Sequence, residues 1–343
     1  MKVYYDERQR LHDPQTYLSR GQLRRPQEVP ARSHAILAGL RALGHEASAP
    51  ADHGRGPIER VHDAGYLHFL ETGHRRWHEV PEDWGEEIVS NVFVRPAGPP
   101  RGILAEAATY LADGGCPVGA HTWTAAYWAA QCALSPADAL LAGERVGHAA
   151  CRPPGHHARR DAAGGFCYLN NGAIAAEALK VRFPRIAILD PDMHHGQGVQ
   201  EIFYDRDDVL YVSIHGDTEN FYPAVTGHPE ERGSGAGEGF NLNLPMPHGS
   251  PEAVFFDRLG EARAAIEAFA PDALVVTLGF DIHERDPQAK VSVSSAGFRR
   301  LGATVAGFGV PLLVVQEGGY YLEGLEENSR EFFTGVGTGV GTG

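Results

Sequence analysis

The sequence predicts one α/β domain in which a central, mostly parallel sheet is covered by helices on both faces. Five short apolar segments in its second half have the length of buried strands, and segments of helical character separate them. Strands that alternate with helices form right-handed βαβ units, which leave the strands parallel and both faces covered. No linker-like tract divides these units, and 343 residues can form one large α/β domain.

The predicted elements follow from the apolar pattern. The strands are Val146 to Cys151, Ile186 to Leu189, Val209 to Ile214, Ala273 to Leu278 and Pro311 to Val315. The helices are Arg32 to Leu43, Trp123 to Leu141, Asn171 to Lys180, Pro251 to Phe269 and Ala296 to Phe308. In sheets of this kind, ligands bind at the carboxyl ends of the strands. Functional residues are therefore expected in the loops that follow the strands.

Two stretches lack a periodic pattern. Residues 72–121 carry Trp77, Trp84 and several prolines, which predicts a long insertion loop, and such loops often serve as lids or interface elements. Residues 334–343 alternate glycine with threonine and valine, and this composition predicts a flexible tail. The predicted organisation is a single domain over residues 1–333 followed by that tail.

The composition argues against several classes of partner. The formal net charge of -14 opposes binding to nucleic acid or to an anionic membrane. No apolar stretch is long enough to span a bilayer, and the N-terminal segment Met1 to Asp6 lacks the apolar core of a signal peptide. The four cysteines are widely spaced, which favours reduced thiols in a cytoplasmic protein.

Acids and imidazoles directly follow the predicted strands. The segment Ile186 to Leu189 leads into Asp-Pro-Asp-Met-His-His, and in an extended chain Asp190, Asp192 and His194 face the same way. Carboxylates beside an apolar core are costly unless a cation or close hydrogen-bond partners compensate them. With Asp281, which follows another strand, Asp192 and His194 form a donor set suited to Zn²⁺ or Fe²⁺. Capping of the following helices would explain one aspartate but not the whole set.

Two further loops carry groups that can move protons or donate hydrogen bonds. His156 and His157 stand in a proline-bounded loop after a strand, and histidine is the usual proton shuttle near neutral pH. Gly318 and Gly319 permit a sharp turn that can aim Tyr320 at an oxyanion, although a plain turn before a packed aromatic is the common alternative. With a metal, these groups outline amide hydrolysis. The sequence has no nucleophile elbow or phosphate-binding loop.

Several motifs carry a family resemblance. They are Arg152 to His157, Gly164 to Asn171, Asp190 to Gly196, Leu278 to Asp281 and Glu317 to Tyr320. In this order and spacing they resemble the zinc-dependent histone deacetylase family. The N-terminal half, at Val61 to Thr72 and Thr122 to Ala126, is similar to the bacterial acetylpolyamine amidohydrolases. The resemblance covers nearly the whole chain and implies the arginase/deacetylase α/β fold with long active-site loops.

The resemblance also implies a role for each matching residue. The zinc ligands would be Asp192, His194 and Asp281. His156 and His157 match the tandem histidines, of which the second serves as general base and acid, and Tyr320 matches the oxyanion donor. The remaining matches are Phe166, Tyr222 and Gly165 in the substrate channel, and Asp190 and Ser213 at a structural potassium site, where Asp190 also supports the first histidine.

Two positions depart from the family's pattern. Where the family carries Asp or Asn to orient the second histidine, this chain has Gln197, a neutral amide that leaves the imidazole less basic than a carboxylate would. Where the acetylpolyamine amidohydrolases carry a glutamate for the distant ammonium groups, this chain has Gly115. Asp113 or Glu106 is the expected substitute, although each could equally be a solvated surface acid.

The expected activity is removal of an acetyl or similar acyl group from a small amine, with an acetylpolyamine as the leading substrate. A protein lysine deacetylase or a deacylase of another small metabolite is the alternative. Zn²⁺ is the expected catalytic metal, Fe²⁺ suits the same ligands, and K⁺ is the expected structural ion. By resemblance, the 72–121 insertion builds a homodimer interface. A two-manganese arginase and a silent sensor are further hypotheses, against which the Asp-x-Asp-x-His-His order and the complete catalytic set argue.

Overall fold

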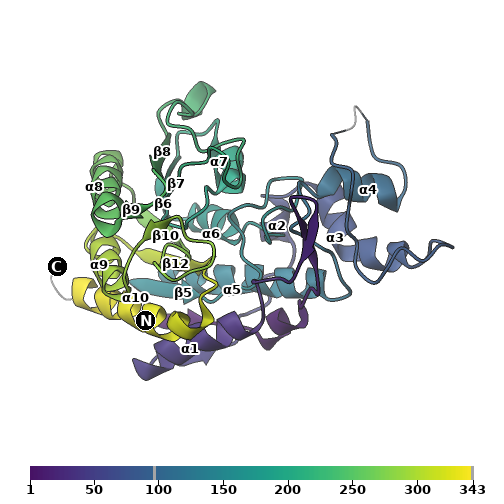
Figure 1. The fold of residues 1–343 in the computed structure, drawn as a ribbon. Coiled ribbons are helices and arrows are strands. Elements are labelled where there is room, and N and C mark those ends of the chain that lie inside the picture. Colours follow the sequence, from purple (N-terminus) through teal and green to yellow (C-terminus); the bar gives the residue numbers. More distant parts are fainter. Residues whose placement is uncertain (96–97, 341–343) are drawn as a thin grey trace.

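The central feature of the fold is a parallel sheet. The computed structural model describes residues 1–95 and 98–340, and within them eight strands follow the order β4-β1-β5-β12-β10-β6-β7-β8 (Figure 1). Every neighbouring pair in this sheet is parallel. The strands are β1 (Lys2–Tyr4), β4 (Ala47–Ser48), β5 (Val146–Ala149), β6 (Ile186–Asp190), β7 (Val209–Gly216), β8 (Asn241–Met246), β10 (Ala273–Leu278) and β12 (Leu312–Gln316).

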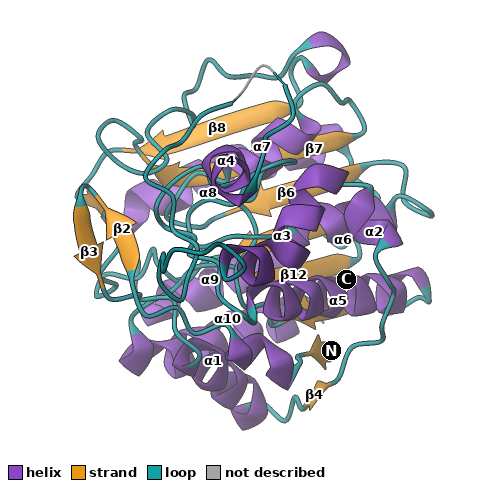
Figure 2. Ribbon diagram, turned by 90° about the vertical axis from the view of Figure 1, so that its right-hand side faces the viewer, coloured by secondary structure: helices purple, strands orange, loops and turns teal. Residues whose placement is uncertain are grey.

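In the part of the chain that the structure describes, two short strand pairs lie outside this sheet. The strands β2 (Tyr17–Ser19) and β3 (Gln22–Arg24) form an antiparallel hairpin, which stands beside the carboxyl edge of the sheet in Figure 2. The strands β9 (Ser250–Pro251) and β11 (Val291–Ser292) pair in parallel.

Helices cover both faces of the sheet (Figures 1 and 2). One face packs against α2 (Gly56–Glu59), α5 (Thr122–Leu141), α6 (Asn171–Leu179) and α7 (Gln197–Phe203). The other packs against α1 (Ala31–Ala42), α8 (Glu252–Phe269), α9 (Ser295–Ala306) and α10 (Leu322–Val340). Each face has its own hydrophobic cluster, as expected when both sides of a parallel sheet are buried. The described residues also include two 3₁₀ turns, Glu7–Leu11 and Gly235–Gly237.

The predicted fold class is confirmed, and the five predicted strands and five predicted helices all form within a few residues of their expected bounds. Apolar runs such as Ile186–Asp190 are fully buried, so their pattern carries an unambiguous signal. The short strands β1 and β4, at one end of the sheet, were not predicted. Nor was β8, in which Asn241 and Asn243 alternate with leucines. Their sequences lack a continuous apolar run, and pairing with a neighbouring strand decides their conformation.

The predicted flexible tail is corrected by the structure. Residues 334–340 form the last turns of α10, and only 341–343 lie outside the described residues. Glycine here serves close packing between helices: a Cβ on Gly335 would lie 2.0 Å from the carbonyl oxygen of Arg299 in α9. Val336 is buried at the same contact. The repeat of small residues therefore lets α9 and α10 approach each other, an arrangement that composition alone does not reveal.

The predicted insertion contains more structure than a loop. The helix α3 (Ala64–Trp77) extends into its start, and α4 (Ile103–Tyr110) lies near its end. Both helices stand away from the sheet in Figure 1, beyond α5. Irregular backbone follows α3 over 78–95, and an antiparallel bridge joins Ile88 in this stretch to Val118 after α4. Among the helices that the structure describes, none combines the length and apolar character needed to cross a membrane.

Candidate active site

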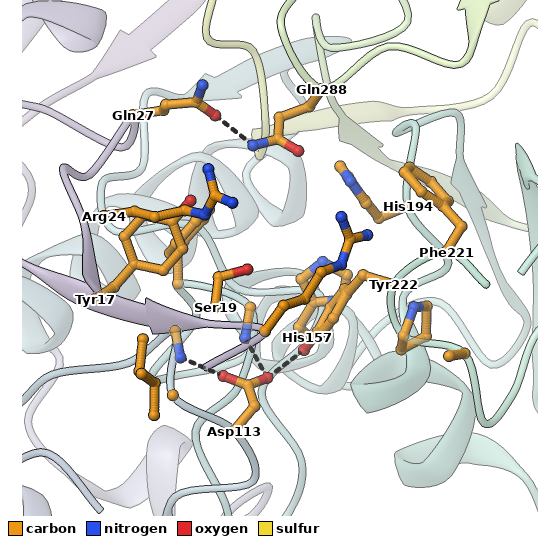
Figure 3. A pocket seen from close by; sticks show the side chains of 18 of the residues that line it. Tyr17, Ser19, Arg24, Gln27, Asp113, His157, His194, Phe221, Tyr222 and Gln288 are labelled. Atoms are coloured by element: carbon orange, nitrogen blue, oxygen red, sulfur yellow. Dashed lines mark hydrogen bonds between the residues drawn. The ribbon is translucent and has the colours of Figure 1, made fainter. Parts of the chain in front are cut away.

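The loops that follow β5, β6, β10 and β12 meet at one edge of the sheet, because parallel strands end on the same side. A cavity of about 850 Å³ opens there. Figure 3 shows side chains from distant parts of the sequence around this space, several of them pointing into it. The lining includes Tyr17, Arg24, Asp113, His157, Gly165, Phe166, His194, Phe221, Tyr222, Lys290 and Tyr320.

The three predicted metal ligands come together beside this cavity. One donor atom from each of Asp192, His194 and Asp281 lies within 4.8 Å of the other two. Both aspartates are fully buried, whereas His194 lines the cavity. The strand β6 ends at Asp190 and the chain then turns, so the ligands converge through a turn and not through the alternation of an extended strand.

Backbone groups hold the two carboxylates in place. The N–H of Gly318 donates to Asp192 Oδ2 at 2.9 Å, and the N–H of Met193 donates to Asp281 Oδ1 at 3.0 Å. Glycine is required beside them: a Cβ on Gly279 would lie 2.1 Å from Asp192 Oδ2, and one on Gly318 would lie 2.5 Å from Asp281 Oδ2. The Gly-Gly and Leu-Gly-Phe-Asp motifs thus leave room for the carboxylates as well as shaping turns.

The charges of this cluster are consistent with a cation site. Burial and the proximity of Asp192 raise the pKa of Asp281 to about 7. Burial alone would also raise the pKa of Asp192, but His156 and His194 lower it. Two buried carboxylates this close repel each other, and a divalent cation between them would remove that cost. Two aspartates and one histidine therefore fit Zn²⁺ or Fe²⁺.

The two tandem histidines have different partners. His156 Nδ1 lies 3.0 Å from Asp190 Oδ2, whereas His157 Nδ1 lies 2.6 Å from Gln197 Oε1, and the ring centroids are 3.9 Å apart. Burial alone would lower the pKa of His156, but Asp190 and Asp192 raise it to about 10. Burial lowers the pKa of His157, and repulsion from His156 and from His194 adds to this effect. The pair thus combines a charged and a neutral imidazole.

Buried groups that the sequence analysis did not identify fix the loops around these histidines. Glu317 Oε2 accepts hydrogen bonds from the backbone N–H groups of Gly155 and His156 at 2.6 and 3.0 Å. Arg32, fully buried on α1, donates to the carbonyl oxygens of Glu317 and Gly319. Arg32 is paired with the equally buried Glu28 at 2.9 Å. No local motif marks Arg32, because an arginine on a predicted helix usually lies at the surface.

Tyr320 occupies the cavity end of the Gly-Gly turn. Its backbone N–H donates to Asp286 Oδ2 at 2.6 Å, and its ring lies 4.8 Å from the Arg32 guanidinium. Burial raises the pKa of Tyr320 well above its usual value, so the hydroxyl keeps its proton and can donate it in a hydrogen bond. The ring of Phe166 meets it edge-on at 6.0 Å.

The predicted channel residues surround His157. The ring of Tyr222 packs edge-on against the imidazole at 4.8 Å, and Gly165 lies close to both rings. Gly165 has a φ of +53°, and a Cβ there would lie 2.3 Å from His157 Cδ2. Any larger residue at this position would displace the imidazole, which explains the glycine. Phe166 follows at a φ of 70°, a strained angle that turns its ring into the cavity.

The residues predicted to bind potassium are neighbours in the sheet. Asp190 on β6 is in register with Ser213 on β7, and both are fully buried. The Asp190 carboxylate also accepts from the hydroxyl of Tyr211 at 2.8 Å. Ser213 Oγ lies 2.8 Å from His215 Nδ1. These contacts support His156 through Asp190, and the potassium ion itself remains a prediction.

The two candidate acids for a substrate cation have different locations. Asp113 lines the cavity. A Cβ on Gly115 would lie 2.9 Å from Asp113 Oδ1, so the Asp113 carboxylate lies next to the position that a side chain at residue 115 would occupy. Glu106 lies on α4, is paired with Arg76 (2.7 Å) and is not among the cavity residues. Within one chain, the Glu106 carboxylate is therefore compensated by Arg76 and does not line the cavity, and a contact of Glu106 with the substrate stays a prediction.

The outer part of the cavity carries cations that the sequence analysis did not single out. Arg20 and Arg24, from the β2–β3 hairpin, are exposed at its rim together with Lys290 (Figure 3 shows Arg24). Gln27 and Gln288 are hydrogen-bonded to each other on the same side. The hairpin precedes every recognised motif in the chain, so only the tertiary structure connects it with the site.

A parallel α/β sheet with this donor set, histidine pair and tyrosine at its carboxyl edge is the framework of a metal-dependent amide hydrolase. Residues 26–336 match the family model of the histone deacetylase domain. The chain therefore belongs to the histone deacetylase family and is a hydrolase with a deacetylase domain.

Individual relatives extend over the whole chain. The acetylpolyamine amidohydrolase of Burkholderia pseudomallei is 58% identical over 337 residues, which cover 98% of this chain and 99% of that protein. The acetylpolyamine amidohydrolase of Mycoplana ramosa is 40% identical, with 98% and 99% covered. A crystal structure of the Burkholderia pseudomallei acetylpolyamine aminohydrolase superposes with a TM-score of 0.98 over 99% of both chains. The HDA15 HD domain, at 27% identity, gives 0.80 over 99% of this chain and 90% of that one.

Proposed function

We propose that the protein is a zinc-dependent amidohydrolase that removes an acetyl or similar acyl group from an amine, with an acetylpolyamine as the leading substrate. The observation that carries the proposal is the buried donor cluster of Asp192, His194 and Asp281 beside a cavity lined by His157 and Tyr320. The names of the full-length relatives support the substrate.

The metal would be held by Asp192, His194 and Asp281. When bound, Zn²⁺ supplies a Lewis acid that polarises the amide carbonyl and makes a water more acidic. Fe²⁺ suits the same donors, so the native metal is to be determined by elemental analysis. One transition metal per chain supports this assignment, and two manganese ions would indicate the arginase-type alternative.

The two histidines share the proton transfer. His157 uses Nδ1 for its contact with Gln197, which leaves Nε2 to take a proton from the attacking water and later return it to the amine nitrogen. The Asp190 carboxylate, 3.0 Å from His156 Nδ1, favours the charged form of His156, and this charge would stabilise the negative charge that develops at the carbonyl. The Tyr320 hydroxyl donates a hydrogen bond to the same developing oxyanion.

The chemistry of the cavity supports two classes of amine. Asp113 is an acid within the cavity and could attract a distal ammonium group. Arg20, Arg24 and Lys290 at the rim oppose such a group and favour an acyl amine whose far end carries no positive charge, such as an acetyl-lysine within a peptide. Polyamine deacetylation remains the leading proposal because of the relatives, and lysine deacetylation is the second candidate.

A kinetic comparison tests the substrate. We expect acetylputrescine and acetylcadaverine to give higher kcat/KM values than an acetyl-lysine peptide with the metal-loaded enzyme. If the peptide is preferred by more than about tenfold, which is roughly 1.4 kcal/mol of transition-state binding, the polyamine assignment fails. No turnover of any acylated amine would contradict the enzymatic proposal altogether and favour the sensor hypothesis.

Three further assignments complete the proposal. K⁺ would bind near Asp190 and Ser213, which equilibrium binding of K⁺ can test.

The chain would form a homodimer through its insertion, where apolar side chains are exposed: Val92 46%, Phe93 41%, Val94 53% and Leu104 49%. Sedimentation equilibrium tests the dimer, with a monomer at micromolar concentration as the contrary result. A cytoplasmic location, proposed from the reduced cysteines and charge, is testable by cell fractionation.

A further inference from the structure

A continuous chain of hydrogen bonds connects the catalytic histidine pair with the substrate cavity. His157 Nδ1 lies 2.6 Å from Gln197 Oε1, Gln197 Nε2 lies 3.1 Å from the Tyr222 hydroxyl, and that hydroxyl lies 2.7 Å from Asp113 Oδ2. Figure 3 shows the last contact, with Asp113 beneath Tyr222 and His157. These hydrogen bonds link the loops after β5 and β7 with the first residue of α7 and the segment that follows α4.

The direction of each hydrogen bond follows from the number of protons. An ionised Asp113 can only accept, so the single proton of the Tyr222 hydroxyl points to it. The Tyr222 oxygen must then accept from Gln197, and this places the NH₂ group of the amide at Tyr222 and its oxygen at His157. His157 must therefore donate from Nδ1, and in the neutral imidazole its Nε2 is then left without a proton.

We propose that Tyr222 and Asp113 are positioning residues that select the amide orientation of Gln197 and, through it, the tautomer of His157 with Nδ1 protonated. This inference rests on the proposed function, in which His157 takes a proton at Nε2. Asp113 is held in place at one end of this series of hydrogen bonds, because the backbone N–H groups of Gly115 and Gly165 also donate to it at 2.7 and 3.0 Å.

Control of the His157 tautomer by Tyr222 and Asp113 is needed because residue 197 is a glutamine. A carboxylate there could only accept from the imidazole, so it would impose one tautomer without further help. An amide rotated by half a turn would present its NH₂ group to Nδ1 and favour the opposite tautomer, whose Nε2 carries the proton and cannot act as a base. Gln197 and His157 are 5% and 4% exposed, so water offers little to correct a wrong orientation.

The test is a set of kinetic comparisons on the metal-loaded full-length enzyme. Tyr222→Phe keeps the ring against His157 and removes the hydroxyl. We expect it to lower kcat about tenfold or more, up to the 10²–10⁴-fold that general acid–base catalysis contributes, with little change in KM. In the Gln197→Asp background, where no amide can rotate, the same change should have almost no effect on kcat. Asp113→Ala should lower kcat for acetylcadaverine and for an acetyl-lysine peptide alike.

A surface pair provides the matched control. The hydroxyl of Tyr127, a residue of α5, donates a hydrogen bond to Asp52 at the surface. Tyr127→Phe therefore removes the same type of tyrosine–aspartate hydrogen bond outside the cavity. This variant should keep the wild-type kcat. Melting temperatures and metal content of all variants separate a folding defect from an effect on the base.

The tautomer can also be observed without turnover. Nitrogen-15 spectra of the zinc-loaded protein, with the His157 signals assigned by their loss in His157→Ala, should show a protonated Nδ1 in the wild type and a mixed population in Tyr222→Phe. The proposal is overturned if Tyr222→Phe keeps both kcat and tautomer, or if its effect persists unchanged in the Gln197→Asp background. If the wild type is inactive but the tautomer changes as expected in Tyr222→Phe, the result contradicts the proposed function and leaves the positioning role of Tyr222 supported.

Discussion

The floor and the rim of the cavity are built in different ways. The floor consists of the residues at the carboxyl ends of β5, β6, β10 and β12, and its side chains are held by buried backbone donors and by the Arg32–Glu28 pair. The rim consists of the β2–β3 hairpin and Lys290, and its cations are exposed. The floor follows from sheet geometry, whereas the rim is added by loops from elsewhere in the chain.

This difference separates the reaction from the choice of substrate. A group at the floor is surrounded by buried charges, so removing one partner leaves another uncompensated and has a large effect. A charge at the rim is screened by solvent and salt, so its effect on substrate preference is small. Substitutions at the floor should therefore alter kcat for all substrates, and those at the rim should change the ranking of substrates.

The largest effect is expected for a metal ligand. His194→Ala should lower kcat/KM by roughly 10³-fold or more for every substrate, since Lewis-acid stabilisation contributes several kcal/mol. Bound metal, measured by elemental analysis, should fall in parallel. The matched control is His34→Ala, which removes an exposed histidine from α1. Full activity with metal retained in His194→Ala would mean that the donor cluster is not the metal site.

The next effect separates the oxyanion donor from the metal. Tyr320→Phe should reduce kcat by about 10²–10³-fold, the usual loss when one oxyanion donor is removed, while the metal content stays at the wild-type level. Tyr321→Phe, at the adjacent position, serves as the control. Equal activities of the two variants would contradict the role of the Tyr320 hydroxyl.

A smaller effect concerns the pH profile. Gln197→Asp places a negative charge next to His157, which stabilises the imidazolium and raises the pKa of the base. Because the neutral form is active, activity is lost as the pH falls through this pKa, so the acidic limb of the kcat/KM profile should move to higher pH. Profiles of both enzymes with one acetylated diamine test this. An unmoved acidic limb would count against contact between Gln197 and the base.

The smallest effect is expected at the rim. The double variant Arg20→Gln/Arg24→Gln should raise kcat/KM for acetylcadaverine by about two- to fivefold, as each exposed like charge contributes less than about 1 kcal/mol. The gain should shrink at high salt and be absent for an acyl amine without a distal charge. An equal gain for both substrates would show that the arginines act by steric obstruction and not by charge.

The sequence alone determined the framework and most of the floor. Fully buried strands require continuous apolar runs, so the sequence predicted β5, β6, β7, β10 and β12. Because these strands are parallel, the polar residues directly after them meet at one edge of the sheet. Reasoning from composition gave a wrong prediction where glycines serve close packing between helices. The glycines of residues 334–340 indicated flexibility, but in the structure they allow α9 and α10 to approach closely.

Only the tertiary structure decided which distant groups complete the site. It brings Arg32 from α1 beneath Tyr320, Asp113 into contact with Tyr222, and the β2–β3 hairpin to the rim, whereas Glu106 is left with Arg76. A local sequence pattern records the conformation and burial of its own segment. Contacts between segments that are far apart in the chain depend on how the whole domain packs, and no local pattern encodes them.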